Sequence, residues 1–344
     1  QTRAALVASQ DQNQSRLLQL QLSQQESQYS ILLKSMEDFQ LAKARAKDML
    51  VVFSPAEVPT SPVRPNKLMN LLIGVVLGLF LGVGAAFVVE YLDKTVKRPE
   101  DVEQRLGVPV IGTVPFFRLK EPKEAVLLFN PDSQAAGEAY RMLRTNLQFA
   151  QVGQPAKTLL VTSTGPGEGK SVTVANLGIV LAQAGKRVVL VDADLRRPSL
   201  HRLFGLPRDE GVTTLLLSSE GEADLERALQ ETPLEHLKVV PSGPLPPNPS
   251  ELLGSERMWG LLKRLEEKAD VVILDSPPLL SASDASILAA TVDQVLLVVG
   301  SGEARLEAVR QAKESLERVK ACLGGVVLNK VRRESGGYYY YHYY

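Results

Sequence analysis

The pattern of hydrophobic and polar positions divides the chain into unlike stretches, of which the first covers residues 1–53. Gln, Ser, Ala and Leu dominate this stretch, and it contains neither Pro nor Gly. Apolar residues recur at alternating three- and four-residue steps, with Gln25 interrupting the series: Leu18, Leu22, Tyr29, Leu32, Met36 and Phe39. This spacing predicts a helical or coiled-coil arm. The alternative is an ordinary amphipathic helix of a globular domain, because the seam is short.

Residues 54–67 are predicted to form an extended linker. Four prolines fall within this short stretch: Pro55, Pro59, Pro62 and Pro65. Proline disfavours helix and favours a stiff, extended backbone. The linker therefore separates the helical arm from the segment that follows.

Residues 68–90 are predicted to form a transmembrane helix. No charged residue occurs from Leu68 to Val89, and a helix of about 22 residues spans the roughly 30 Å hydrocarbon core of a bilayer. A buried core helix is the alternative, but such helices are usually shorter and have a polar face. Small residues at four-residue steps would let two such helices approach closely: Gly74, Gly78 and Gly82.

Composition excludes some classes of function. Lys plus Arg and Asp plus Glu number 39 each, so no overall positive field would draw the protein onto nucleic acid. The single cysteine, Cys322, is expected to pack in the interior, and three scattered histidines complete no zinc pattern. Basic residues flank the apolar run too evenly to fix its orientation. The sequence opens on Gln1, so we expect an N-terminally truncated chain.

Residues 91–133 are assigned to a juxtamembrane linker and residues 134–334 to an α/β domain. In that domain apolar, β-branched runs alternate with helical stretches: Thr158–Thr162, Arg187–Asp192, Leu237–Val240, Asp270–Asp275, Gln294–Val299 and Gly325–Asn329. This alternation predicts a mostly parallel sheet covered on both faces, in a three-layer α/β/α fold. Ligands of such folds bind beyond the carboxyl ends of the strands.

A glycine-rich loop follows the first of these strands and precedes a predicted helix. Its Gly-Lys-Ser core is typical of a phosphate-binding loop, although Thr164 stands where the strict pattern has its first Gly. In such a loop backbone N–H groups converge on phosphate oxygens, Lys170 meets the β- and γ-phosphates, and the Ser171 hydroxyl binds Mg²⁺. The expected nucleotide-binding residues are Gly165, Gly167, Glu168, Gly169, Lys170, Ser171 and Val172. A glycine-rich turn without a ligand is the alternative.

Two further strands end in aspartate, one leading into Asp192 and Asp194 and the other into Asp275. A lone strand-end Asp usually caps a helix or forms a turn, but beside a phosphate loop such carboxylates reach Mg²⁺ directly or through its water. We expect Ser171, Asp192 and Asp275 to be metal ligands. The expected catalytic residues are Lys170, Asp192, Asp194 and Asp275, with Asp192 accepting the proton of an attacking hydroxyl and Asp194 supporting the metal.

Taken together, these motifs resemble those of the bacterial tyrosine kinases of the polysaccharide co-polymerase family, over nearly the whole chain. Val189–Asp194 are similar to the family's additional Asp-x-Asp motif (Walker A′), and Val272–Asp275 to its Walker B motif. Related partition and cell-division ATPases carry a signature lysine where this chain has Gly165. Resemblance to related ATPases implies that Asn329 contacts the adenine, and a turn-forming role is the alternative.

Residues 335–344 are predicted to be a flexible, tyrosine-rich tail. Six of the last seven residues are tyrosines: Tyr338, Tyr339, Tyr340, Tyr341, Tyr343 and Tyr344. No packed core needs such a run, whereas phosphate acceptors on a tether would each gain nearly two negative charges. A coil of about ten residues reaches roughly 15–20 Å, so we expect the tail to enter a neighbouring subunit's site. An artificial tag is the alternative.

Three charged residues lie three apart on the helix predicted around residues 134–149: Glu138, Arg141 and Arg144. By itself such a stripe is usually a solvated face. It also matches the family's E-x₂-R-x₂-R motif, and the resemblance implies an interface that closes a ring-shaped homo-oligomer. Each subunit would then present its tail to the next.

The resemblance implies a membrane-anchored protein-tyrosine autokinase that uses ATP and Mg²⁺ and regulates exopolysaccharide or capsule polymerisation and export. The kinase domain would face the cytoplasm at the bacterial inner membrane, the arm would be extracytoplasmic, and a first transmembrane helix would precede it. Expected partners are membrane lipid, a tyrosine phosphatase and polysaccharide polymerase or export proteins, without nucleic acid. One alternative is a membrane-bound ATPase switch with water as acceptor. Another is a scaffold whose nucleotide site has decayed.

Overall fold

The computed structural model describes residues 2–48, 58, 64–117, 122–127, 134–150, 156–218 and 222–332. It comprises two compact units, Gln1–Ala85 and Ala86–Tyr344. In the first unit the predicted helix is present as α1 (Thr2–Asp48), whose described side chains are all exposed. Its packing as a coiled coil stays a prediction. Most of the proline-rich linker lies outside the described residues.

The apolar run forms the helix α2 (Lys67–Leu92), 26 residues long. Its most apolar window has a mean hydropathy of 2.7, and none of that window is buried. Among the described residues it is the one helix long and apolar enough to cross a membrane. An isolated apolar surface of this size is costly in water, which favours a lipid environment.

The unit Ala86–Tyr344 is built on one sheet, which has eight strands among the described residues. The strands are β1 (Val110–Pro115), β2 (Thr158–Ser163), β3 (Val188–Asp192), β4 (Gln230–Glu231), β5 (Leu237–Val240), β6 (Val271–Asp275), β7 (Gln294–Gly300) and β8 (Leu323–Val331). Their order is β1-β8-β7-β2-β6-β3-β5-β4, and every pair is parallel except β4 with β5. The predicted mostly parallel sheet is therefore confirmed.

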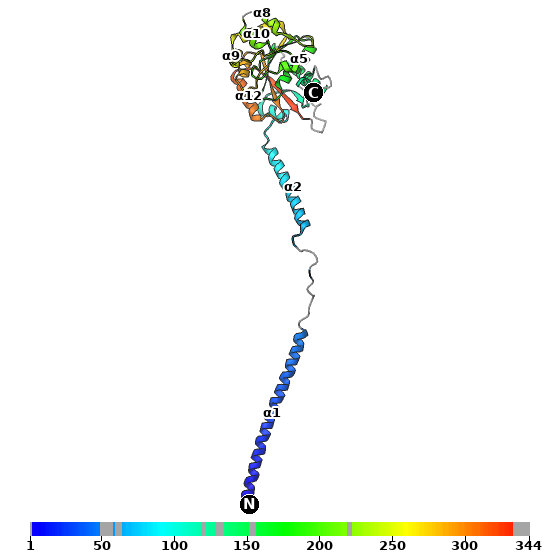
Figure 1. Cartoon of the computed structure of the whole chain (residues 1–344), viewed down its shortest axis with the longest axis vertical. Helices are drawn as coiled ribbons and strands as arrows, with labels where there is room; N and C mark the ends of the chain where they lie inside the picture. Colours follow the sequence, from blue (N-terminus) through cyan, green and yellow to red (C-terminus); the bar gives the residue numbers. More distant parts are fainter. Residues whose placement is uncertain are drawn as a thin grey trace. The chain divides into compact units, whose positions relative to one another are not determined.

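Helices cover both faces of the sheet (Figure 1). One face packs against α4 (Gln134–Ala150), α5 (Lys170–Gln183) and α6 (Leu200–Phe204). The other packs against α3 (Pro99–Leu106), α7 (Val212–Leu217), α8 (Glu222–Ala228), α9 (Pro249–Leu253), α10 (Glu256–Lys268), α11 (Asp284–Ala289) and α12 (Leu306–Arg318), and a short 3₁₀ helix, η1, covers Pro122–Ala125. Leu160 enters one core and its neighbours Leu159 and Val161 the other, as the twofold repeat of a strand requires. The fold is the predicted three-layer α/β/α arrangement.

The structure differs from the sequence-based boundary at residue 134. Part of the stretch 91–133, assigned to a linker, belongs to the sheet, because β1 pairs in parallel with β8 at one edge. Val96 is fully buried, and its N–H donates to the Ala304 carbonyl at 2.9 Å. The sequence concealed β1 because Gly112 interrupts its apolar run. A Cβ at Gly112 would lie 2.9 Å from Leu143 Cδ1, so the Leu143 side chain would have to shift. Cys322, expected to be interior, is exposed.

The strand order determines where the chemical motifs meet. β6 lies between β2 and β3, so the loops that follow these three strands are neighbours at one edge of the sheet. Asp192 and Asp275 are directly paired in the register of β3 with β6, and Val161 of β2 pairs with Asp275. The phosphate loop and both aspartate motifs therefore meet although they are far apart in sequence.

Candidate functional site

The phosphate loop joins the end of β2 to the beginning of α5. Gly167 and Gly169 have φ of 84° and 95°, the left-handed region that residues other than glycine adopt with strain. α5 begins at Lys170, so its unpaired N–H groups and the positive end of its dipole face the loop. This is the geometry of an anion-binding site for phosphate groups.

The Glu168 side chain stabilises the loop by accepting hydrogen bonds from its first residues. Its carboxylate accepts the backbone N–H groups of Thr164 and Gly165, each at 3.1 Å, and the Thr164 hydroxyl. The residue is 4% exposed. Burial raises the pKa of the Glu168 carboxyl, an effect that the three hydrogen bonds partly offset. The sequence placed Glu168 among the nucleotide-binding residues, and the structure shows it shaping the loop.

Glu168→Gln is expected to weaken nucleotide binding. A glutamine has one acceptor oxygen, so its NH₂ group would face one of the two N–H donors that the carboxylate now accepts. A lost partner for a buried donor costs about 1–3 kcal/mol, so we expect the Mg·ADP affinity to fall about 5- to 150-fold while kcat changes less. Calorimetric titration with Mg·ADP and ATP turnover measure these quantities. Glu303→Gln, which changes the neighbouring carboxylate paired with Lys330, is the matched control, and equal affinities in both variants would refute the prediction.

Asn329, expected to contact the adenine, braces the phosphate loop. Its amide nitrogen donates to the Glu168 carbonyl at 2.8 Å, and a Cβ at Gly169 would overlap the same nitrogen. Asn329 is buried at the carboxyl end of β8. A contact with the adenine stays a prediction, whereas the contact with the loop explains why Gly169 has no side chain.

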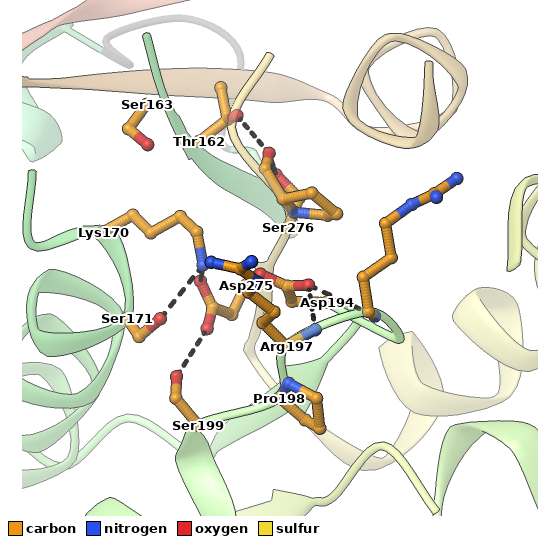
Figure 2. Close-up of polar contacts among 12 residues, drawn as sticks. Thr162, Ser163, Lys170, Ser171, Asp194, Arg197, Pro198, Ser199, Asp275 and Ser276 are labelled. Carbon is orange, nitrogen blue, oxygen red and sulfur yellow. Dashed lines mark hydrogen bonds and ion pairs between the residues drawn. The ribbon is translucent and has the colours of Figure 1, made fainter. Parts of the chain in front are cut away.

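Lys170 and two aspartates converge above the sheet edge (Figure 2). The Lys170 ammonium lies 2.9 Å from Asp194 Oδ2 and 3.4 Å from Asp275 Oδ1, and it donates to the Ser171 hydroxyl at 3.2 Å. Its side chain is 13% exposed. Burial by itself lowers the pKa of Lys170, but the carboxylates of Asp275 and Asp194 outweigh burial and raise it. Lys170 is therefore charged at every physiological pH.

Asp192 completes a cluster with more acid than base. Its Oδ2 accepts the N–H groups of Ser199 and Leu200, each at 3.0 Å, whereas Oδ1 is buried without a hydrogen-bond partner among the described residues. Burial, and then the charge of Asp275, raise the pKa of Asp192 to about 8. Burial likewise raises the pKa of Asp275. The pair of Asp192 and Asp275 therefore keeps a proton near neutral pH, and a bound cation would compensate their charge in its place.

The oxygen atoms of this cluster are suited to bind a magnesium ion. An unpartnered carboxylate oxygen of Asp192, the carboxylate of Asp275 and the Ser171 hydroxyl are hard oxygen ligands at the mouth of a phosphate loop. No cage of three or more acidic, His or Cys side chains is preformed within the described ranges. Mg²⁺ usually needs no such cage, because it takes one or two carboxylates and completes its shell with water and phosphate oxygens.

The remaining predicted residues lie on α4, on α5 and in the tail. Arg141 pairs with Glu138 at 2.6 Å on the exposed face of α4, and Arg144 donates to the Val180 carbonyl of α5 at 3.0 Å. Val172 lies in the first turn of α5 and is partly buried. The tail tyrosines lie outside the described residues. The subunit interface and the phosphate acceptors therefore stay predictions.

Ser199 is a site residue that the sequence analysis missed. Its hydroxyl lies 3.4 Å from Asp275 Oδ2, and its N–H holds Asp192. A serine after Pro198 and before a short helix could have been noticed as a capping residue. Its place beside a carboxylate 76 positions later could not, because only the pairing of β3 with β6 creates it.

The fold and the site define a P-loop nucleotide-binding protein with two aspartate motifs. Residues 156–325 match the AAA domain family, and residues 11–91 match the family described as G-rich domain on putative tyrosine kinase. The chain is 45% identical over 192 residues to tyrosine-protein kinase YwqD of Bacillus subtilis, covering 56% of this chain and 80% of YwqD. It is 35% identical over 312 residues to putative tyrosine-protein kinase EpsB of Ralstonia nicotianae, covering 88% of this chain and 41% of EpsB.

A solved structure agrees with these relatives. The kinase domain of the Escherichia coli tyrosine kinase Etk matches with a TM-score of 0.63 and 33% identity, covering 72% of this chain and all of that domain. The chain therefore belongs to the bacterial tyrosine kinases. It spans less than half the length of EpsB, and most of the length of YwqD.

Proposed function

We propose that this protein is a membrane-anchored autokinase that transfers the ATP γ-phosphate to the C-terminal tyrosines of neighbouring subunits. The observation that supports this most is the convergence of Lys170, Asp194 and Asp275 beside a phosphate loop, in a chain whose last residues are tyrosines. Membership of the tyrosine kinase family supports the same acceptor. Control of exopolysaccharide or capsule polymerisation and export is the process we propose for it.

The chain's own groups would divide the work of phosphoryl transfer. The loop N–H groups and the amino end of α5 hold the phosphates, and Lys170 places a positive charge against them. Mg²⁺, when bound through Ser171, Asp192 and Asp275, would neutralise phosphate charge. Asp192, whose Oδ1 has no hydrogen-bond partner among the described residues, would accept the tyrosine proton in its ionised form. Asp194 keeps Lys170 in place.

The proposed cellular arrangement follows from the same parts. α2 anchors the protein in the bacterial inner membrane, the kinase domain faces cytoplasmic ATP, and the helical arm is extracytoplasmic. Arg141 and Glu138, exposed on α4, contribute to a ring of subunits. Phosphorylated tails repel one another and loosen that ring. A tyrosine phosphatase and polysaccharide polymerase or export proteins are the proposed partners.

Mixing two variants of this chain tests transfer between subunits. The donor lacks Tyr338–Tyr344, and the acceptor carries Lys170→Met, an intact tail and a heavy-isotope label. We expect phosphotyrosine on the labelled tail at a rate that rises with donor concentration, and none on the acceptor alone, as read by peptide mass spectrometry. Melting curves verify that the acceptor is folded.

Two outcomes contradict the proposal in different ways. Wild-type protein that releases ADP without forming phosphotyrosine is an ATPase switch with water as acceptor. Phosphotyrosine in the wild type but none on the labelled acceptor means transfer within one subunit.

A further inference from the structure

A second cluster lies beside the catalytic one, centred on Arg196. The Arg196 guanidinium donates to both oxygens of Asp284, at 2.7 Å from Nε and 3.0 Å from Nη2. Nη2 also donates to the Ser250 hydroxyl at 3.2 Å, and Ser250 in turn contacts Asp284 Oδ1. The Asp284 carboxylate is fully buried, whereas the Arg196 side chain is 46% exposed. A two-pronged charged contact of this kind is strong and fixes geometry.

The cluster joins the loops that follow three neighbouring strands. Arg196 follows β3, Ser250 lies in α9 after the proline-rich loop that follows β5, and Asp284 begins α11 after the loop that follows β6. Burial by itself raises the pKa of Asp284, but the hydrogen bonds from Arg196 and Ser250 outweigh burial and lower it. Asp284 is therefore a fixed anion to which the loop after β3 is tied.

The backbone of the same arginine holds a catalytic carboxylate. Asp194 Oδ1 accepts the N–H groups of Arg196 at 3.3 Å and Arg197 at 2.9 Å, and the Arg197 contact is drawn in Figure 2. Asp194 Oδ2 accepts the Lys170 ammonium at 2.9 Å. The position of Lys170 thus depends on Asp194, and that of Asp194 on the turn that the Arg196 side chain anchors.

We propose that Arg196, Asp284 and Ser250 form a latch that positions Asp194, and through it places the Lys170 ammonium against the γ-phosphate that the acceptor attacks. Arg196 and Asp284 touch neither the phosphate loop nor Lys170 in the contacts described, so they are positioning residues. The latch also gives the proline-rich loop after β5 (Pro241–Asn248) a role, because that loop leads into α9 and so places Ser250 in the cluster. The inference rests on phosphoryl transfer at this site, whatever the acceptor.

The chain contains a matched control for the latch. Arg187 donates through Nε and Nη2 to Asp270 Oδ1, and its own N–H donates to Asp270 Oδ2. Arg187 and Asp270 directly precede β3 and β6, so the same kind of pair joins the same two strands at their amino ends. Asp270 is 36% exposed whereas Asp284 is buried, so melting curves of all the variants separate a loss of fold from a loss of turnover, and only the latch should affect turnover.

The test is a double-mutant cycle with Arg196→Lys and Asp284→Asn in the full chain. Lysine at position 196 keeps the positive charge but cannot make the two-pronged contact of a guanidinium. Asparagine at position 284 keeps the shape of the side chain but has one acceptor oxygen fewer. We expect each variant to lower the kcat for ADP release about tenfold, normalised to nucleotide sites titrated by calorimetry, with ATP affinity changed less than threefold. Because the two side chains act as a unit, the kcat of the double variant should be no lower than the kcat of the less active single variant. Arg187→Lys and Asp270→Asn should leave kcat within twofold.

A loss in kcat below threefold in either single variant overturns the latch, and so do losses that multiply in the double variant or an equal loss in the control pair. ADP release is measured beside phosphotyrosine. If the wild type releases ADP without phosphorylating tyrosine, the kinase proposal fails while the latch is still tested.

Discussion

Lys170→Met is expected to abolish measurable phosphoryl transfer. The ammonium is the positive side chain closest to Asp194 and Asp275 in the contacts described, and it lies at the amino end of α5 where phosphate charge must be held. Removing one such preorganised charge costs about 10²–10³ in kcat in comparable sites, and a larger loss is expected where the group also orients the phosphates. ADP release and phosphotyrosine formation, normalised to nucleotide bound, measure the loss. Retention of a tenth of the wild-type rate would contradict the assignment.

Lys170→Met is also expected to lower the free energy of unfolding, by an amount that depends on pH. Methionine leaves the buried carboxylates without their cation, and breaking a buried pair costs about 3–5 kcal/mol. The deficit relative to wild type should shrink as pH falls, because protonation of Asp275 removes the uncompensated charge. Urea unfolding at pH 6 and pH 8 without Mg²⁺ checks this. Arg187→Met, at an exposed pair, serves as the control and should show no comparable pH dependence.

Asp192→Asn is expected to stabilise the nucleotide-free protein while inactivating it. The pKa of Asp192 is raised from an ordinary value of 3.8 to about 8, so between these limits the folded state binds a proton that the unfolded state has lost. The free energy of unfolding therefore falls as pH rises through this window. Asparagine removes that slope. At pH 8 in EDTA we expect a gain of at least about 1 kcal/mol, which raises the Tm by about 2–4 °C.

Adding Mg·ATP should reverse the ranking. The wild type gains stability through Asp192, whose buried Oδ1 has no partner among the described residues, whereas the asparagine variant loses an anionic ligand and a proton acceptor. We expect kcat to fall about 10²–10⁴-fold. If Asp192→Asn is no more stable than the wild type at pH 8 without metal, the pKa of Asp192 is not raised in the folded protein. A variant that remains active would exclude it as the base.

Local pattern predicted much of this molecule because several of its elements are defined by short-range physics. The uncharged run from Leu68 to Val89 can form little except an apolar helix, and it does so as α2. Six buried parallel strands show as continuous apolar runs because both faces of each strand are covered. The phosphate loop is readable because its glycines permit a left-handed backbone that other residues resist.

The sequence could not reveal β1, because an interrupted apolar run becomes a strand only where β8 offers an open edge and Leu143 needs the space above Gly112. Nor could it show that Asn329 grips the phosphate loop, since 161 positions separate it from Glu168.

The sequence by itself determined the class of fold, the apolar helix and the chemical type of each motif, because these depend on residues that are close to one another in the chain. Only the tertiary structure decided how the motifs act together. The placing of β6 between β2 and β3 pairs Asp192 with Asp275 and brings Asp275 into contact with Lys170. The same strand order ties Arg196 to Asp284. The reason is physical: burial and neighbouring charge set the pKa of a carboxyl, and both arise only when the strands have assembled.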